Sequence, residues 1–598
     1  MKIIPAKTAG FCMGVRRAVN IVLELVERTD QPIYTLGPLI HNPQVVELLK
    51  RRGVVPAESL EEIKSGIVVI RSHGIRPQLR EELEKRGLKI VDATCPRVAR
   101  VHKIVEKYSQ QGYLTIILGD AGHSEVEGIL GFVQGEAYII EEPEQVQELP
   151  EADKVLFVAQ TTQSQEKFQK IASALKNRYP QLKEEELKIV NTICDSTERR
   201  QNEVKELAGR VDAFVIVGGK KSANTRRLKE IAEQEGKPAF LVETEAELVP
   251  EQLRAFPRIA LSAGASTPNW MIRRVYEELR QIALLEHSLP FRLFQRLVRL
   301  GVILNFYLGL GAGLLALLSG VFLREKIYLL SGLIAFFYIF AVHNLAVLSR
   351  PGLLEVIEPG RGRWFLRHRQ SLMSISFLGL VLGGLFAFMH SIWSGLLYSG
   401  LVFLSLLYQV PFGRKNQRGL FPYQSLMDIP GSKDIFMALA WAVVIVLVPM
   451  VEKTELHFEP RFWLLFSIIG LMVLSRSILQ DFRDLQADRM VGKETLPILL
   501  GERKSRWLVN FIILTGLIVS FLAWQFSGIG ISIWGLFLGM AWLWLCVPLF
   551  TIRTVIQGLR AELLIDSGFI LAGALAVSYT HLRAHETSLH LVCRLLLE

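Results

Sequence analysis

Three cysteines stand in the same kind of local sequence and together could bind metal. Cys12, Cys95 and Cys194 each follow a strand-like segment and precede an amphipathic helical stretch. The repetition predicts three α/β units, each presenting one thiol at a strand-to-helix turn. A thiol at a helix N-terminus lies at the positive end of the helix dipole, so we expect a bias toward the thiolate, the form that binds metal.

This group of thiols has three chemical interpretations. Buried structural cysteines are the common case in a cytosolic protein, but the repeated setting favours a shared role. Three thiolates in a reducing compartment suit either zinc with a fourth ligand or an iron–sulfur cluster with one iron left open. The absence of a Cys-x-x-Cys pair argues against a zinc ribbon. Convergence of three units favours the larger cluster, whose open iron would accept a substrate oxygen.

Small polar residues on turns after strand-like runs form a second group. His41, His73 and His123 lie in such turns, and Glu125 follows the last of them. Other turns supply further polar side chains, on Thr161, Ser222, Asn224 and Ser266, and Ala223 lies between two of them with its backbone N–H. A single loop histidine is more often a solvated or capping residue, but imidazoles, hydroxyls and amides in combination can surround a diphosphate. The set therefore predicts a diphosphate site.

Residues 1–285 resemble the 4-hydroxy-3-methylbut-2-enyl diphosphate reductase (IspH/LytB) family, which completes the non-mevalonate isoprenoid pathway. The resemblance rests on motifs in order: Gly10-Phe11-Cys12-Met13-Gly14-Val15, His41-Asn42-Pro43, Ser72-His73-Gly74, Asp92-Ala93-Thr94-Cys95-Pro96, Gly122-His123-Ser124-Glu125, Gln160-Thr161-Thr162, and the segment with Ser222 and Asn224. It implies a three-lobed, pseudo-threefold α/β fold around one 4Fe-4S cluster.

The same resemblance implies a role for each residue. Cys12, Cys95 and Cys194 would hold three irons, and the substrate hydroxyl would bind the fourth. The diphosphate would be bound by His41, His73, His123, Thr161, Ser222, Ala223, Asn224 and Ser266. Glu125, helped by Thr161, would donate the proton in a two-electron removal of the allylic hydroxyl, which yields isopentenyl and dimethylallyl diphosphates. Electrons would come from an external donor: ferredoxin, flavodoxin or an NADPH system.

Two details qualify that expectation. At Ala223 many members carry a second serine, so its backbone N–H would have to donate instead. A non-enzymatic alternative is an iron–sulfur redox sensor, which would need a basic nucleic-acid-binding face. Lys and Arg balance Asp and Glu over residues 1–287, so the formal charge of +10 belongs to the rest of the chain and does not indicate nucleic-acid binding.

Two contrasting halves must position these residues. The chain has 598 residues, 50% hydrophobic and 21% charged, and a mean hydropathy of +0.30, so apolar and charged residues must be segregated. Residues 1–287 alternate β-rich runs with charged helices, which predicts a soluble α/β half. Apolar segments long enough to span a bilayer follow, at about 300–323, 327–348, 371–389, 391–410, 434–451, 462–480, 507–526 and 531–551, with a ninth from Leu563. We expect an all-α multi-spanning bundle.

The distribution of Lys and Arg predicts its orientation. These residues concentrate in the loops on the same side as the first half, as cytoplasmic loops do. Met1 leads directly into a strand-like segment rather than a signal peptide. We therefore expect a multi-pass protein of the bacterial inner membrane, in contact with lipid, with residues 1–285 in the cytoplasm.

The membrane half carries its own polar motif. Asp481, Asp484 and Asp488 share one helix face, and such a cluster beside a bilayer is costly unless it binds cations, here Mg²⁺. With Gly492–Pro497 it resembles the second aspartate-rich motif of UbiA-type membrane prenyltransferases. That resemblance implies transfer of a prenyl chain from its diphosphate to an aromatic or quinone-precursor acceptor.

The segment of this chain where the family's first aspartate-rich motif should stand departs from the family's pattern. After Asn344 the chain reads Leu345-Ala346-Val347-Leu348-Ser349-Arg350 where aspartates should stand, and Glu355 and Glu358 are the acids that could substitute. Three hypotheses stay open: an active prenyltransferase, a degenerate relative that binds isoprenoid diphosphates without chemistry, or an anchor that tethers the reductase.

The domain boundaries follow from these patterns. We expect the reductase domain at 1–285, a linker at 286–298 and the UbiA-like domain at 299–577, cut within its ninth helix. Residues 578–598 resemble translated sequencing adaptor, so we expect no metal site at His581, His585, His590 and Cys593.

Overall fold

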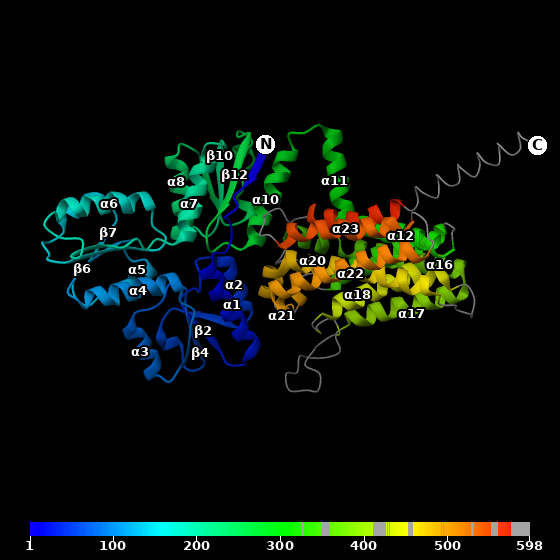
Figure 1. Cartoon of the computed structure of the whole chain (residues 1–598), viewed down its shortest axis with the longest axis horizontal. Coiled ribbons are helices and arrows are strands. Elements are labelled where there is room, and N and C mark those ends of the chain that lie inside the picture. The colour runs from blue at the N-terminus through cyan, green and yellow to red at the C-terminus, as the bar shows by residue number, and fades with distance from the viewer. Residues whose placement is uncertain are drawn as a thin grey trace, which may run out of the picture. The chain divides into compact units, whose positions relative to one another are not determined.

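The computed structural model divides into two compact units, Met1–His287 and Ser288–Glu598 (Figure 1). The structure describes residues 1–324, 328–349, 359–410, 426, 429, 431–451, 459–491, 493, 495–527, 532–551 and 560–575. Glu355, Glu358 and the expected adaptor tail lie outside the described residues.

The first unit contains three four-stranded parallel sheets, which confirms the predicted α/β class (Figure 1). One sheet has the order β3-β2-β4-β5, with strands Val54–Ala57, Ile33–Leu36, Ile67–Ile70 and Lys89–Asp92. The second has the order β7-β6-β8-β9, with strands Ala137–Ile140, Leu114–Leu118, Val155–Ala159 and Leu187–Ile189. The third has the order β1-β12-β10-β11, with strands Lys2–Pro5, Arg258–Ala263, Ala213–Val217 and Ala239–Val242.

The third sheet joins the beginning and the end of this unit. β1 pairs in parallel with β12, in a register that sets Lys2 opposite Arg258 and Pro5 opposite Leu261. The other two sheets lie between these strands in the sequence. Strands β6, β8 and β10 are buried at every position, as expected for central parallel strands covered on both faces.

Three helices carry the chain from each sheet to the next, and each begins directly after a cysteine. They are α1 (Met13–Arg28), α4 (Pro96–Ser109) and α7 (Asp195–Ala208). The other helices of this unit are α2 (Pro43–Arg51), α3 (Pro77–Lys85), α5 (Ser124–Leu130), α6 (Gln165–Arg178), α8 (Ala223–Gln234), α9 (Pro250–Leu253) and α10 (Asn269–Leu284), with short turns η1 (Leu60–Glu62), η2 (Pro143–Glu148) and η3 (Glu245–Glu247).

The second unit is helical in its described residues. It contains α11 (Leu289–Ile303), α12 (Phe306–Arg324), α13 (Leu329–Ser349), α15 (Pro359–Arg367), α16 (Arg369–His390), α17 (Ile392–Gln409), α18 (Ser432–Ala442), η5 (Val443–Leu447), α19 (Val448–Met450), α20 (Pro460–Val491), α21 (Leu496–Leu500), α22 (Glu502–Ser527) and α23 (Ser532–Thr551). Residues 560–575 are also helical. The segment expected as a linker falls mostly within α11.

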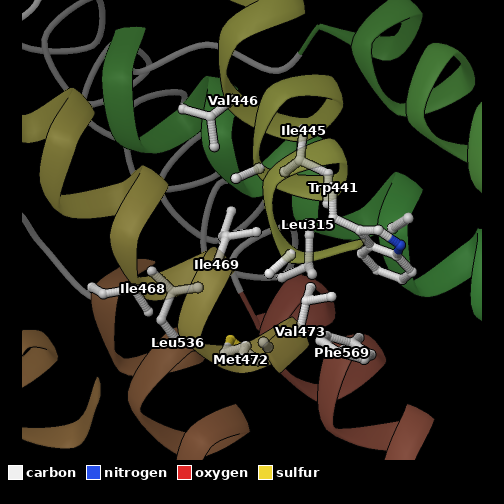
Figure 2. Packing of buried hydrophobic residues seen from close by; sticks show 14 of the residues in the cluster. Leu315, Trp441, Ile445, Val446, Ile468, Ile469, Met472, Val473, Leu536 and Phe569 are labelled. Carbon is white, nitrogen blue, oxygen red and sulfur yellow. The ribbon is translucent and has the colours of Figure 1, made fainter. Parts of the chain in front are cut away.

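Eight helices among the described residues are long and apolar enough to cross a membrane. They coincide with the eight complete spans expected from the sequence. Their shared core contains Trp441 from α18, Met472 from α20 and Leu536 from α23. Figure 2 shows these side chains packed with Leu315 of α12 and with Phe569. The predicted membrane bundle is therefore confirmed as a compact helical unit.

Candidate active site

The polar residues expected at the site follow the two middle strands of each sheet. His41 follows β2 and His73 follows β4, His123 follows β6 and Thr161 follows β8, and Asn224 and Ser266 follow β10 and β12. In an open parallel sheet, the crevice beyond the carboxyl ends of the strands forms where neighbouring connections run in opposite directions. All three sheets have this strand order. The fold therefore explains why residues so distant in sequence could serve one site.

The three imidazoles lie together. The ring centroids are 4.8 Å apart for His41 and His73, 5.5 Å for His41 and His123, and 5.7 Å for His73 and His123. Two lobes contribute, because His41 and His73 come from the first sheet and His123 from the second. The histidines singled out by sequence thus form one cluster.

Burial keeps these histidines neutral at physiological pH. Burial is the largest cause that lowers the pKa of His41 to about 4, and the neighbouring His123, Arg71 and Arg226 contribute to this shift. Burial also lowers the pKa of His73 and of His123. His123 Nδ1 accepts the Glu125 backbone N–H at 3.1 Å. A neutral His123 therefore carries its proton on Nε2, where it can donate to a ligand.

Several polar atoms around this cluster lack a partner. Nε2 of His41, Nδ1 of His73 and both amide atoms of Asn224 are buried and accept or donate no hydrogen bond among the described residues. Buried polar atoms are normally paired, because each unpaired one costs about 1–3 kcal/mol. Unsatisfied imidazole and amide groups are therefore the polar lining expected for a ligand that is an acceptor, such as a diphosphate.

Loops of the third sheet approach the histidine loop directly. The Ser266 hydroxyl donates to the His41 carbonyl at 3.3 Å. A Cβ at Gly219 would stand 2.5 Å from the same carbonyl, so only glycine fits there. Ser222 is the N-cap residue of α8, and Ala223 and Asn224 form its first turn, all three buried. The backbone N–H of Ala223 is therefore at a helix N-terminus, where anions bind.

Glu125 is a buried carboxyl with one defined partner. It is 2% exposed, and its Oε1 accepts the Thr161 backbone N–H at 2.8 Å. Burial raises the pKa of Glu125, while hydrogen bonds from Thr161 oppose the rise. A carboxyl with a raised pKa holds its proton at a higher pH and can serve as a general acid.

The three cysteines are tied to the loops that carry the polar residues. Each is the N-cap residue of its helix, as predicted. The Cys12 N–H donates to Ala265 O at 3.1 Å, the Cys95 N–H to Ser72 O at 2.9 Å and the Cys194 N–H to Thr161 O at 3.0 Å. These carbonyls belong to, or adjoin, residues predicted to bind substrate, so the thiols and the polar lining share one framework.

The expected bias toward thiolates is wrong for two of these thiols. Burial raises the pKa of Cys95 and of Cys194, and the neighbouring thiols add to the rise. The backbone N–H groups of each helix start oppose this effect but do not outweigh it. The helix N-terminus alone therefore does not ionise them, and a bound metal would have to displace their protons.

Sequence reasoning missed a bracing network. Gln163 donates to Asp120 Oδ1 at 3.0 Å, and Arg227 of α8 contacts Asp120 at 3.3 Å and Gln163 Oε1 at 3.0 Å. The network joins the loop before Glu125 to the third lobe. Asp120 lies within a recognised turn, but its partners are distant in sequence and only the fold brings them together.

In the membrane unit the three predicted aspartates each meet a cation. Asp481 is ion-paired with Lys433 of α18, Asp484 with Arg483 at 2.6 Å, and Asp488 with Lys493 at 2.8 Å. Oδ2 of Asp481 is buried and has no hydrogen-bond partner among the described residues. Within the part of the chain that the structure describes, no three His, Cys, Asp or Glu side chains are grouped closely enough to hold one metal ion.

Asn344, where the first motif should begin, is fully buried in a structural role. Its amide nitrogen donates to Leu304 O at 2.7 Å and to Phe340 O at 2.8 Å, and its Oδ1 accepts from Asn305 at 3.1 Å. It therefore fixes the start of the bundle, and on α13 no aspartate follows it.

Comparison with known proteins assigns the first half. Residues 3–280 match the family described as LytB protein. The 4-hydroxy-3-methylbut-2-enyl diphosphate reductase of Aquifex aeolicus is 44% identical over 284 residues, which are 47% of this chain and 96% of that relative. The chain belongs to the 4-hydroxy-3-methylbut-2-enyl diphosphate reductase family. Among solved structures, this family's reductase from Plasmodium falciparum is 31% identical, with a TM-score of 0.44 over 49% of this chain and 89% of that one.

The second half matches a different family. Residues 366–558 match the UbiA prenyltransferase family. A solved UbiA homolog from Archaeoglobus fulgidus bound to GPP and Mg²⁺ is 14% identical, with a TM-score of 0.35 over 48% of this chain and 97% of that one. The reductase-family chain therefore also carries a UbiA prenyltransferase segment, in the fused arrangement that the sequence predicted.

Proposed function

We propose that the first unit reduces 4-hydroxy-3-methylbut-2-enyl diphosphate to isopentenyl and dimethylallyl diphosphates. The observation that carries this proposal is the set of buried, unpartnered atoms on His41, His73 and Asn224, which lies in the same framework as the cysteines and Glu125. Relatives named for this activity are 40–44% identical over nearly their whole length, which supports it.

The cysteines are suited to an iron–sulfur cluster. Cys12, Cys95 and Cys194 come from three helix starts, and the neighbouring thiols raise the pKa of Cys95 and of Cys194, so the three cysteines lie near one another. They are not grouped within the described residues as ligands of one ion would be, and a cluster of several irons needs wider spacing. We assign them to one 4Fe-4S cluster, which when bound would supply electrons and an open iron for the substrate oxygen.

The other residues bind and protonate. His41, His73, His123, Thr161, Ser222, Ala223, Asn224 and Ser266 would bind the diphosphate, in which neutral imidazoles donate N–H groups. Glu125 would protonate the departing hydroxyl, and Thr161 would orient that carboxyl through their 2.8 Å hydrogen bond. Overall, the substrate gains two electrons and two protons, its allylic C–O bond breaks and water leaves. Hydroxide is a poor leaving group, so the acid is necessary.

Anaerobic purification of the full chain tests this assignment. We expect a brown protein with broad absorbance in the visible blue and an electron paramagnetic resonance signal, after reduction, that changes when the substrate is added. A colourless protein that binds zinc instead would contradict the cluster. An unchanged signal with substrate bound would contradict the placement of the substrate hydroxyl beside it.

For the membrane unit we propose prenyl transfer from a diphosphate to an aromatic or quinone-precursor acceptor. The match over residues 366–558 supports it. Carboxylate oxygens are the ligands that Mg²⁺ prefers, and Asp481, Asp484 and Asp488 would hold it by competing with Lys433 and Lys493. A bound Mg²⁺ would neutralise the leaving diphosphate. We further propose an inner-membrane location with the first unit in the cytoplasm, as the charge distribution predicts.

Assay of detergent-solubilised full chain with a prenyl diphosphate and a panel of phenolic acids tests this second activity. We expect Mg²⁺-dependent product that is lost in Asp481→Asn and Asp488→Asn and retained in Glu502→Gln, a change at an exposed acid outside the motif. Binding of the prenyl diphosphate without product would favour the degenerate relative. Absence of binding would favour the anchor.

A further inference from the structure

An arginine recurs at the same position after each cysteine. Arg17, Arg100 and Arg199 each stand five residues after Cys12, Cys95 and Cys194, and all three are exposed. In each helix the arginine lies four residues after the residue that follows the cysteine, so the two share one helix face. The proposed function uses none of these arginines.

The helix starts that bear them are joined to one another. Arg17 of α1 donates to Thr94 O, beside Cys95, at 3.0 Å. Arg97 of α4 forms an ion pair with Asp195 of α7. A Cβ at Gly14 would stand 2.5 Å from Cys95 Sγ, which brings α1 against the start of α4. The starts of α1, α4 and α7 therefore adjoin one another, and we call the surface formed by these three starts, each bearing one repeated arginine, the arginine face.

This face is open to solvent close to the thiols. Met13, directly after Cys12, is 65% exposed. The residues after the other two cysteines, Pro96 and Asp195, are exposed as well. An exposed methionine among charges is a feature of adaptable protein-binding surfaces. The surface next to the thiols is therefore exposed to solvent and includes one apolar side chain, that of Met13.

The charge of this face is positive. Asp195 is already paired with Arg97, and Asp92, at the end of β5, is paired with Arg80 at 3.1 Å. Arg17, Arg100 and Arg199 have no ion pair with an acidic side chain among the described residues. A single exposed arginine on a helix usually interacts only with water. Solvation does not explain why an arginine recurs at the same position after each of three cysteines.

We propose that this face docks an acidic one-electron carrier protein. The inference rests on the proposed iron–sulfur function, because such a cluster needs electrons delivered one at a time. Each encounter would pass one electron from the reduced carrier, and two encounters would supply the pair that reduces one substrate. Complementary charge raises the encounter rate and weakens with salt. The exposed Met13 would form the apolar centre of the contact.

The test compares two electron donors on the full chain in neutral detergent, without anionic lipid. One donor is a reduced acidic flavodoxin, and the other is reduced methyl viologen, a small radical monocation. In Arg100→Glu/Arg199→Glu we expect the flavodoxin concentration for half-maximal rate to rise at least tenfold and its salt dependence to flatten, while the viologen-driven rate does not fall. Arg210→Glu/Arg254→Glu, an equal charge change at exposed sites away from the three helix starts, should leave both unchanged.

The outcomes separate the two proposals. An unchanged flavodoxin dependence would overturn the docking face and leave another occupant, such as an anionic lipid surface, for these arginines. A parallel fall with both donors would also overturn it, because the arginines would then act on the site itself. Failure of the wild-type chain to turn over with viologen would instead contradict the proposed reductase.

Discussion

The backbone N–H of Thr161 donates to Oε1 of Glu125 at 2.8 Å. The carbonyl of Thr161 also accepts the Cys194 N–H at 3.0 Å. Thr161, which follows β8, therefore binds the Glu125 carboxyl through its N–H and the Cys194 turn through its carbonyl. Because both bonds use backbone atoms, the fold itself sets the position of the acid relative to the cysteine, and the Thr161 side chain adds a further hydrogen bond to Glu125.

Removing the acid should abolish turnover without removing the metal site. We expect Glu125→Gln to lower kcat by about 100-fold or more, since general acid catalysis contributes about 10²–10⁴-fold. Visible absorbance should be retained, because the amide keeps an acceptor for the Thr161 N–H. Glu127→Gln, two residues along on the same helix and partly exposed, should lower kcat less than twofold. Equal effects of the two changes would contradict the role of Glu125.

The raised pKa of Glu125 predicts that kcat falls as the pH rises. Burial raises the pKa above the ordinary value of 4.5, so the acid form extends to higher pH and is lost as the pH rises through the raised value. We expect kcat with viologen to decline on the alkaline side in the wild-type chain and to be flat, at its residual level, in Glu125→Gln. An alkaline decline of the same shape in both chains would assign it to another group.

Two asparagines should respond in opposite ways. Asn224 has two buried amide atoms without partners among the described residues, so Asn224→Ala should weaken substrate binding about tenfold or more and leave thermal stability unchanged or raised. Asn42 caps α2, accepting the Val45 N–H at 3.1 Å, so Asn42→Ala should cost about 1 kcal/mol of stability. Titration and thermal unfolding without ligand check both. A clear loss of stability in Asn224→Ala would contradict a ligand-facing amide.

Glycine at position 14 should be needed for metal loading. A Cβ there would stand 2.5 Å from Cys95 Sγ, so Gly14→Ala should displace the thiol and lower the iron content and visible absorbance severalfold. Gly209→Ala is the matched control, because its nearest neighbour would be 3.8 Å away. Full iron content in Gly14→Ala would show that Cys95 can move without loss of the site.

Much of the fold could be predicted because it depends on local patterns. The segments before Cys12, Cys95 and Cys194 are edge strands with partly exposed positions, which their β-forming residue types predict, and the long runs after residue 300 are helices by length. The cysteines cap helices for the same local reason. Ionisation of Cys95 could not be predicted, since it depends on burial by distant segments.

Contacts between distant helices and strands could not be predicted from the sequence. The bracing of Asp120 by Arg227 joins residues from two lobes. Lys433 pairs with Asp481 because α18 packs against α20. Arg483 and Lys493 are near Asp484 and Asp488 in the sequence, but the Lys433 partner of Asp481 comes from a distant helix and follows only from the packing.

The most direct measurement is anaerobic product analysis of the full chain with 4-hydroxy-3-methylbut-2-enyl diphosphate and reduced methyl viologen. We predict isopentenyl and dimethylallyl diphosphates together, with two electrons consumed for each substrate lost. Recovery of unchanged substrate from a chain that carries its full complement of iron would contradict the account.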